Sequence, residues 1–250
     1  MRQSALESGC KPTDFLAKKN LVVESKRVRG ARKNLELPYI CDLTYYGNGV
    51  VASVHREHMD AVRSFVGKYQ QARLFETPVI YELDEYFRSR GSRVCFQLSY
   101  YLPDLNEVQD HDCGYDIRVL EPWELDGIYS LQWRNALSLN RRELDVLAVG
   151  AFCKNNQLVG LAGCSADCET MWQAGYDVLP EYRGKGIGST LLSRLAIETV
   201  KRGKVPFCRV PWCNIKSVRN ANRAGFRLAW TQVTVKNGKF TEGMMQSLCN

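Results

Sequence analysis

Long apolar runs are missing from the sequence, and histidine is scarce. None of its 250 residues lies in a stretch approaching the roughly 20 apolar residues that a membrane-spanning helix needs. Residues 1–19 also lack the hydrophobic segment of a secretory signal, so we expect a cytoplasmic protein without a membrane partner. The three histidines, His55, His58 and His111, are too scattered to predict a histidine-rich metal centre.

Cysteine pairs at metal-binding or redox spacing are also missing, although the chain has ten cysteines. Cys164 and Cys168 come closest, but three residues separate them, whereas zinc and thioredoxin motifs have two. Most cysteines stand in apolar, strand-like runs, where a thiol behaves as a small buried hydrophobic group. The pattern predicts reduced thiols and no bound metal.

Charge of one sign does not dominate strongly, because 34 basic residues face 27 acidic ones for a net charge of +7. This balance favours anionic partners only weakly. The sharpest basic run, Lys26 to Lys33, would suit nucleic-acid contact or a solvated loop. We favour the loop, since no nucleic-acid-binding module surrounds the run.

A polar, turn-rich segment at 103–114 divides the sequence. We predict an N-terminal α/β region of unassigned role at 1–112 and a second domain at 113–250. Within the first, residues 49–69 are predicted as a strand followed by a helix, since apolar side chains recur at three- and four-residue steps. Two further elements are a helix at 79–91 and a buried strand at 93–102.

The second domain is predicted as a mixed sheet with helices on its faces. Apolar runs and turn residues predict its strands and helices. The strands are expected at 115–120, 171–179, 205–212 and 226–236, with a hairpin over 148–165; helical stretches are expected at 121–133, 141–147 and 187–201, and from Asn214 onward.

A glycine-rich loop, Arg183 to Ser189, joins a predicted strand to the long predicted helix. Three glycines there remove side chains that would hold a ligand away, and Arg183 and Lys185 add positive charge. The first backbone N–H groups of a helix have no internal partner and carry the positive end of its dipole. The loop is therefore predicted to bind a diphosphate. It lacks the P-loop pattern, and Ser189 breaks the dinucleotide-binding glycine pattern.

The pattern Arg183-x-x-Gly186-x-Gly188 resembles the coenzyme A loop of the GNAT superfamily of acyl-CoA-dependent N-acyltransferases. Asn214, Ser217 and the following Gly-Phe pair resemble that family's second cofactor-side helix and its turn into the next strand. The resemblance covers residues 115–236. It implies a GNAT-like fold of the α/β class, preceded here by a smaller α/β domain, with acetyl-CoA as co-substrate.

The resemblance also implies where coenzyme A would bind. In the family the fourth and fifth strands splay apart around the pantetheine arm, which assigns 176–179 and 205–212 to the walls of the slot. Backbone N–H of either Val178 or Leu179 would meet the cofactor. The expected cofactor-binding residues are Val178, Leu179, Arg183, Gly184, Lys185, Gly186, Ile187, Gly188, Ser189, Asn214 and Ser217.

Catalytic side chains are less well indicated, since Ala221 and Trp172 stand where many family members have a tyrosine acid and a glutamate base. Tyr176 is a candidate acid or acceptor contact, with a packed core tyrosine as the other interpretation. Asp177 and Glu169 are candidate bases, and solvated turn carboxylates are common alternatives for residues such as Glu169.

A basic face on the second helix has two interpretations. Lys216, Arg219 and Arg223 stand three and four residues apart, so they share one face. They would contact the adenosine phosphate of the cofactor or form a solvent-facing stripe.

The resemblance thus implies transfer of an acetyl group to a primary amine, which we expect to proceed by direct attack in a ternary complex. Cys213 is the residue on which an acyl-enzyme route would depend. An acyl-CoA sensor without catalysis and a nucleic-acid-associated protein are the alternatives. The acceptor, a small-molecule or peptide amine, stays open because a fold does not determine substrate. Quaternary state stays open too, with a homodimer as one option.

Overall fold

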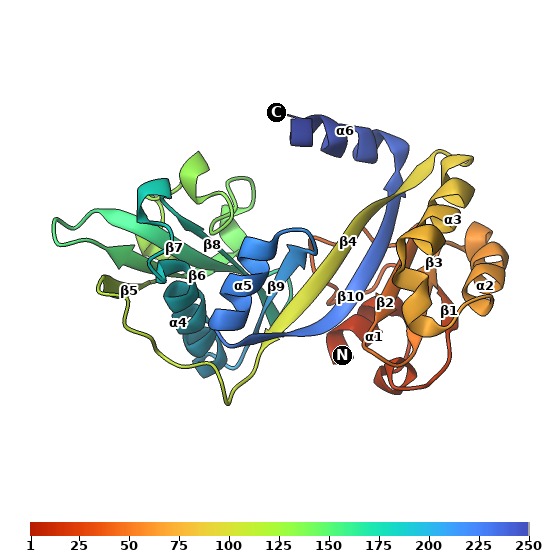
Figure 1. Cartoon of the computed structure of the whole chain (residues 1–250), viewed down its shortest axis with the longest axis horizontal. Helices are drawn as coiled ribbons and strands as arrows, with labels where there is room; N and C mark the ends of the chain where they lie inside the picture. The colour runs from red at the N-terminus through yellow and green to blue at the C-terminus, as the bar shows by residue number, and fades with distance from the viewer. Residues whose placement is uncertain (250) are drawn as a thin grey trace. The chain divides into compact units, whose positions relative to one another are not determined.

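A computed structural model describes residues 1–249, with side chains through residue 247. The chain divides into two compact units (Figure 1). Unit 1 comprises Met1–Ser99 and the residues from Ala229 onward, and unit 2 comprises Tyr100–Leu228. The division passes through two long strands, β4 (Ser92–Pro103) and β10 (Phe226–Asn237), so both units contain part of each.

The division differs from the boundary expected after residue 112. The residues from Ala229 onward belong with the N-terminal elements, although their sequence position suggested the second domain. The reason is that β10 continues past Leu228 and pairs there with β2, from Thr231↔Tyr45 to Val235↔Cys41.

Unit 1 has a mixed sheet with helices on its faces. Its helices are α1 (Arg2–Ser8), α2 (Met59–Gly67), α3 (Thr77–Arg88) and α6 (Gly238–Cys249); its shorter strands are β1 (Leu21–Glu24), β2 (Cys41–Tyr45) and β3 (Val50–Val54). The strand order is β1-β3-β2-β10-β4, with β1 parallel to β3 and β2 antiparallel to both of its neighbours. On one face, α2 and α3 pack against apolar residues of β2, β3 and β10. The predicted strand and helices of this region are confirmed.

The opposite face of that sheet carries a buried polar layer. Arg32 and Glu7 form an ion pair at 2.6 Å with both side chains 2% exposed. Asp42 accepts hydrogen bonds from Gln232 and Thr234, at 2.7 and 2.6 Å. Burial raises the pKa of Asp42 to about 6, although these hydrogen bonds lower it. Arg32 belongs to the basic run at 26–33. One cation of that run is therefore buried inside unit 1 and does not face solvent.

Unit 2 contains the second sheet. Its helices are α4 (Ile187–Lys201) and α5 (Ile215–Arg223); its own strands are β5 (Asp116–Leu120), β6 (Asp145–Phe152), β7 (Leu158–Ser165), β8 (Met171–Val178) and β9 (Val205–Pro211). The order is β5-β6-β7-β8-β9-β4-β10, with β5 to β8 antiparallel and β8 parallel to β9. Residues of β4 that precede the predicted boundary thus complete this sheet. The mixed α/β class expected from the sequence is confirmed.

Each face of the unit 2 sheet has its own apolar core. Helices α4 and α5 contribute Leu191, Leu195 and Ala221 to the core on one face. The connection between β5 and β6 covers the other face with Leu125, Trp133 and Leu137.

The helical stretches expected in that connection are wrong. Residues 121–133 form only two short 3₁₀ turns, Pro122–Glu124 and Leu131–Trp133. Residues 141–147 form a 3₁₀ turn, Arg142–Leu144, followed by the start of β6. Strand pairing prevails over helical propensity at Asp145 and Leu147, which pair with Ser165 and Cys164 of β7.

Candidate functional site

A slot opens between β8 and β9 in unit 2. Their parallel pairing covers only Met171↔Val205, Trp172↔Pro206 and Gln173↔Phe207. β8 then continues to Val178 and β9 to Pro211 without further pairing between them in the described chain. The second half of β8 therefore presents an unpaired edge, and the splayed arrangement implied by the family resemblance is present.

Alternation along β8 shows which backbone groups line this edge. The Leu179 N–H donates to the Val159 carbonyl oxygen at 3.0 Å, so Leu179 points its backbone toward β7. Backbone groups alternate along an antiparallel pair, so the N–H and C=O of Tyr176 and Val178 point the other way, into the slot. Arg183 Nε donates to the Val178 carbonyl at 2.9 Å on that side. Of the two residues expected to meet the cofactor, Val178 has the N–H that faces the slot.

The glycine loop follows directly, after a 3₁₀ turn at Pro180–Tyr182. Gly184 and Gly186 both have φ of +80°, a left-handed backbone that residues with a Cβ rarely adopt. Gly186 is the N-cap of α4, and the Thr190 N–H donates to its carbonyl at 3.1 Å. The N–H groups of Ile187, Gly188 and Ser189 precede that first intrahelical bond and lack an intrahelical acceptor. A cradle of main-chain donors results.

Side chains around the cradle leave it open and positively charged. Arg183 and Lys185 are exposed, and Lys185 Nζ lies 5.0 Å from the centre of the Tyr182 ring. A Cβ added at Gly184 or Gly186 would meet nothing within 4 Å. Ile187 is buried, so only its backbone is accessible to a ligand, and the Ser189 hydroxyl donates to the Gly186 carbonyl at 2.8 Å.

Gly188 is needed for packing. A Cβ there would lie 3.0 Å from Tyr176 Cε2 and 3.1 Å from Asn220 Oδ1. Even a methyl group would require Tyr176 or Asn220 to move by a few tenths of an ångström, and a branched side chain would push the first turn of α4 away from β8 and α5. This glycine therefore holds the cradle against the slot.

Tyr176 projects from β8 toward α5. The side chains of Ser217 and Asn220 approach its hydroxyl and lower its pKa, but burial acts more strongly and raises the pKa above its usual value. The ring belongs to the same apolar cluster as Ala221. Tyr176 is thus a half-buried phenol that stays protonated at neutral pH, beside the unpaired edge of β8.

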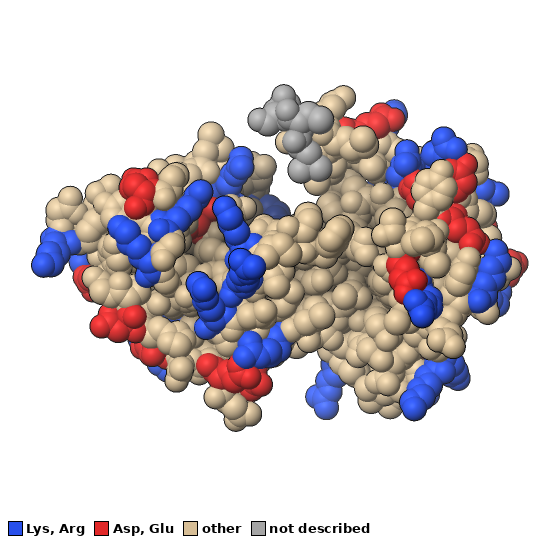
Figure 2. Space-filling view, in the orientation of Figure 1, with Lys and Arg blue, Asp and Glu red and all other residues tan. Residues whose placement is uncertain are grey.

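Helix α5 begins as the sequence indicated. Asn214 is its N-cap, and its side-chain oxygen accepts from the Ser217 N–H at 3.2 Å. Ala221 is 1% exposed, and its methyl group faces the core. Lys216, Arg219 and Arg223 are not in the core, and Figure 2 shows basic side chains gathered over the part of unit 2 that carries α4 and α5.

The candidate carboxylates are dispersed. Asp177 accepts three hydrogen bonds from Asn135 and Ala136, on the opposite face of β8 from Tyr176. Glu169 is exposed in the turn before β8, seven residues from Tyr176, which is roughly 23 Å along an extended strand. Asp167, in the same turn, is buried and paired with Arg141 at 2.6 Å. Only Asp177 therefore lies near Tyr176 along the chain, and the catalytic roles stay predictions.

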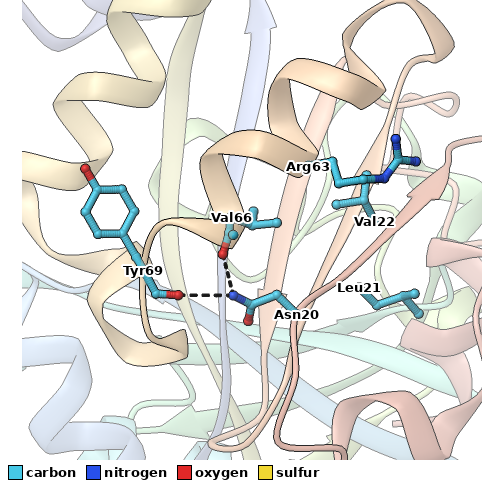
Figure 3. Close-up of a pocket in the computed structure, with 7 residues that line it drawn as sticks. Asn20, Leu21, Val22, Arg63, Val66 and Tyr69 are labelled. Carbon is cyan, nitrogen blue, oxygen red and sulfur yellow. Dashed lines mark hydrogen bonds between the residues drawn. The ribbon is translucent and has the colours of Figure 1, made fainter.

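Unit 1 has a cavity of about 390 Å³ between the start of β1 and the end of α2 (Figure 3). Asn20 Nδ2 donates there to the carbonyls of Val66 and Tyr69, at 2.7 and 3.3 Å. Arg63, at its rim, pairs with Asp60 at 2.5 Å. These contacts tie β1 to α2, and the cavity has no convergent set of titratable side chains.

Within residues 1–249 no three His, Cys, Asp or Glu side chains are grouped as a metal ion would require. The helices found there are all too short or too polar to cross a bilayer.

Residues 104–226, just under half of the chain, match the family model described as the acetyltransferase (GNAT) family. Unit 2 contains a GNAT domain. Its family consists of acyl-CoA-dependent N-acyltransferases, and the resemblance expected from the glycine loop is confirmed. The GNAT match begins at Asp104 and ends at Phe226, so it lies within unit 2, Tyr100–Leu228.

Several solved structures are similar to this chain at low identity. A GNAT-family protein from Novosphingobium aromaticivorans is 21% identical, over 58% of this chain and 66% of that one, with a TM-score of 0.45. A GCN5-related N-acetyltransferase-like protein from Streptococcus suis is 19% identical, over 65% and 68%, with a TM-score of 0.47. A Drosophila protein is 13% identical, over 83% and 77%, also at 0.47. A search of curated proteins found no match.

Two features of the GNAT domain escaped sequence reasoning. Asn220 approaches the Tyr176 hydroxyl and fills the space that a Cβ at Gly188 would need, yet its position in a polar helix gave no signal. Gly163 and Gly175 are directly paired across β7 and β8. Glycine inside a strand often marks a close backbone approach, and this rule would have identified them.

Proposed function

We propose that the chain transfers an acetyl group from acetyl-CoA to a primary amine of a small-molecule or peptide acceptor in the cytoplasm. The observation that supports this most directly is the unpaired edge of β8 beside the main-chain cradle at Arg183–Ser189. A pantetheine arm is a flexible chain with amide groups, which can pair with a strand edge, and a diphosphate suits a helix N-terminus.

Donor binding would use the chain as follows. The N–H groups of Ile187, Gly188 and Ser189 would bind the diphosphate, with Arg183 and Lys185 adding charge. The Val178 N–H would donate to a pantetheine carbonyl. Asn214 and Ser217, at the start of α5, would line the arm from the other side. The basic face of α5 would approach the adenosine phosphate.

Chemistry at the thioester needs little covalent help, because the acyl group is already activated. The free amine nitrogen attacks the carbonyl carbon and the C–N bond forms; the C–S bond then breaks, the nitrogen loses a proton, and the departing thiolate takes one up to leave as the thiol. The enzyme supplies alignment of the two reactants, which is worth several orders of magnitude in rate. No covalent acyl-enzyme is required.

Tyr176 would donate a hydrogen bond to the departing sulfur. Its raised pKa keeps the phenol protonated, so that it donates. Ser217 and Ala221 lie one turn apart on α5. The tyrosine from β8 thus lies against the side of α5 where Ala221 offers only a methyl group. We expect Tyr176→Phe to lower kcat roughly 10- to 100-fold and leave the Kd of acetyl-CoA unchanged.

The test measures thiol release from acetyl-CoA with spermidine, kanamycin, glycine and a lysine-containing peptide, alongside acetyl-CoA binding by titration calorimetry. Amine-stimulated release with binding at the loop supports the proposal. Failure of acetyl-CoA to bind would overturn it.

An acyl-CoA sensor is the second candidate, and Ala221 is the observation that favours it. A sensor would bind acetyl-CoA through the same cradle but show no amine-stimulated thiol release with any of the four amines. The same experiment therefore separates the two functions.

A further inference from the structure

Asp177 has a well-defined set of partners that the transfer chemistry does not use. Its Oδ2 accepts from the backbone N–H of Asn135 at 2.8 Å and of Ala136 at 3.0 Å. Its Oδ1 accepts from Asn135 Nδ2 at 2.6 Å. Both carboxylate oxygens are therefore bonded to one segment of the β5–β6 connection, residues 130–137.

The sheet beneath this segment has no side chain at two paired positions. Gly163 of β7 and Gly175 of β8 are paired neighbours. A Cβ at Gly175 would lie 1.9 Å from the Asn135 carbonyl oxygen, and one at Gly163 would lie 2.2 Å from that of Ala136. Real side chains never approach so closely, so only glycine lets the backbone of 130–137 lie directly on the strands. Asp177, two residues beyond Gly175, fixes it there.

Side chains of β8 lie on two faces of the sheet at the slot, and the two faces have different surroundings. Ala174, Tyr176 and Val178 point to the face where α4 and α5 pack, and they join its apolar core. Side chains alternate along a strand, so Gly175 and Asp177 face the other way. Both faces carry an apolar core, but on the Asp177 face the covering segment has exposed residues at Leu131, Arg134 and Asn135. An acceptor amine would approach the thioester from this face, beside residues 130–137.

Segment 130–137 is suited to form a wall of that entrance. Trp133 anchors it, since its side chain is 2% exposed and packs with Leu125 and Leu161. Leu131 is 75% exposed and Arg134 is exposed as well. The segment thus combines a fixed backbone with outward side chains.

We propose that Asp177 is a positioning residue that holds residues 130–137 as the acceptor-side wall of the slot and thereby sets acceptor affinity. This inference rests on the proposed acetyltransferase function. It assigns acceptor contacts to the exposed side chains of the segment, Leu131 and Arg134 among them. It also gives Asp177 a role different from that of a general base.

The test compares Asp177→Asn with wild type, using the most active amine of the four-amine panel. We expect the KM for the amine to rise at least tenfold, while kcat falls less than threefold and the Kd of acetyl-CoA stays within twofold. Hydrogen exchange at the Asn135 and Ala136 amides should accelerate. Asn135→Ala, which removes one of the three bonds, should shift KM in the same direction by less. Asp116→Asn, an exposed carboxylate on β5, is the matched control.

Three results would overturn the inference. One is an unchanged amine KM with unchanged exchange at Asn135 and Ala136. Another is a kcat loss of about 100-fold or more together with loss of the acidic limb of the kcat–pH profile, which is the behaviour of a general base. The third is an equal KM increase in Asp116→Asn. A wild-type chain that binds acetyl-CoA but acetylates none of the amines would instead contradict the proposed function, and the exchange measurement would still report on the bonds of Asp177.

Discussion

Both units contain a strand, a 3₁₀ turn and a helix in succession, yet only one of these two junctions has a cradle of main-chain donors. In unit 1, β3 leads through Arg56–His58 into α2. In unit 2, β8 leads through Pro180–Tyr182 into α4. The element order is the same, so the difference lies in the residues between turn and helix.

The junction of unit 1 is short and covered by side chains. Helix α2 begins immediately after its turn, and no glycine lies between Val54 and Met59. His58 Nδ1 lies 3.3 Å from the Tyr86 hydroxyl, and its ring packs edge-on to Phe87 at 5.1 Å. Residues of α3 therefore cover the start of α2.

The junction of unit 2 has four more residues after its turn, and two are left-handed glycines. These residues let the chain bend away and return to α4 with its first N–H groups accessible. A strand–turn–helix succession alone does not leave the first N–H groups of the helix accessible. In unit 2 the glycine spacing does.

The largest predicted effect comes from filling the unit 2 junction. Gly188→Val would place a branched side chain against Tyr176 and Asn220 and displace the first turn of α4. We expect acetyl-CoA affinity to fall roughly 100-fold or more, measured by calorimetry, because the three main-chain donors move together. Arg56→Ala in the unit 1 junction should leave affinity unchanged. Equal losses in both variants would contradict the contrast.

Removing a single positive charge should lower acetyl-CoA affinity less than displacing the main-chain donors does. Arg183→Ala removes one exposed cation beside the cradle, so we expect about tenfold weaker acetyl-CoA binding at low salt and a smaller loss at 0.5 M salt. Arg29→Ala, in the basic run of unit 1, is the matched control. If both variants weaken binding alike, general charge and not the cradle attracts the cofactor.

The buried polar layer of unit 1 predicts a pH effect on stability. Burial raises the pKa of Asp42 to about 6, above its unfolded value near 4, so the folded state holds a proton more tightly. Stability from this group is present below pH 4 and is lost as pH rises to about 6. Asp42→Asn should therefore flatten the change in unfolding free energy between pH 4 and pH 6, measured with urea. A steeper dependence in the variant would reverse the assigned sign.

The smallest effect is expected at Cys213, which is exposed after β9. Direct attack needs no thiol, so Cys213→Ser should retain most turnover, measured as amine-stimulated thiol release. Loss of activity together with an acyl group trapped on Cys213 in the wild type would establish a covalent route instead.

Much of the site could be predicted from sequence because its parts are local. The loop Arg183–Ser189 leads directly into α4. Asn214 caps α5 by accepting from the N–H of Ser217, only three residues later. Such signals depend on neighbours in the chain. The expected helix at 121–133 was wrong, because packing of Trp133 into the second core of the sheet decides the conformation there.

Asp177 shows the limit of that approach. As a carboxylate in a strand it suggested a base, yet its partners lie 41 and 42 residues earlier in the chain. Nothing in its neighbours indicates them. Which of Val178 and Leu179 turns its backbone N–H into the slot likewise depends on the register of β8 against β7.

The sequence by itself determined the glycine loop, its place before a helix and the resemblance of this region to the GNAT family, because three glycines and a helix start act within a few residues. Only the tertiary structure decided that β8 and β9 separate after Gln173, that Tyr176 lies against α5, and that Asp177 holds a distant loop. These features depend on strand pairing and on close backbone approach between segments far apart in the chain, which no local spacing encodes.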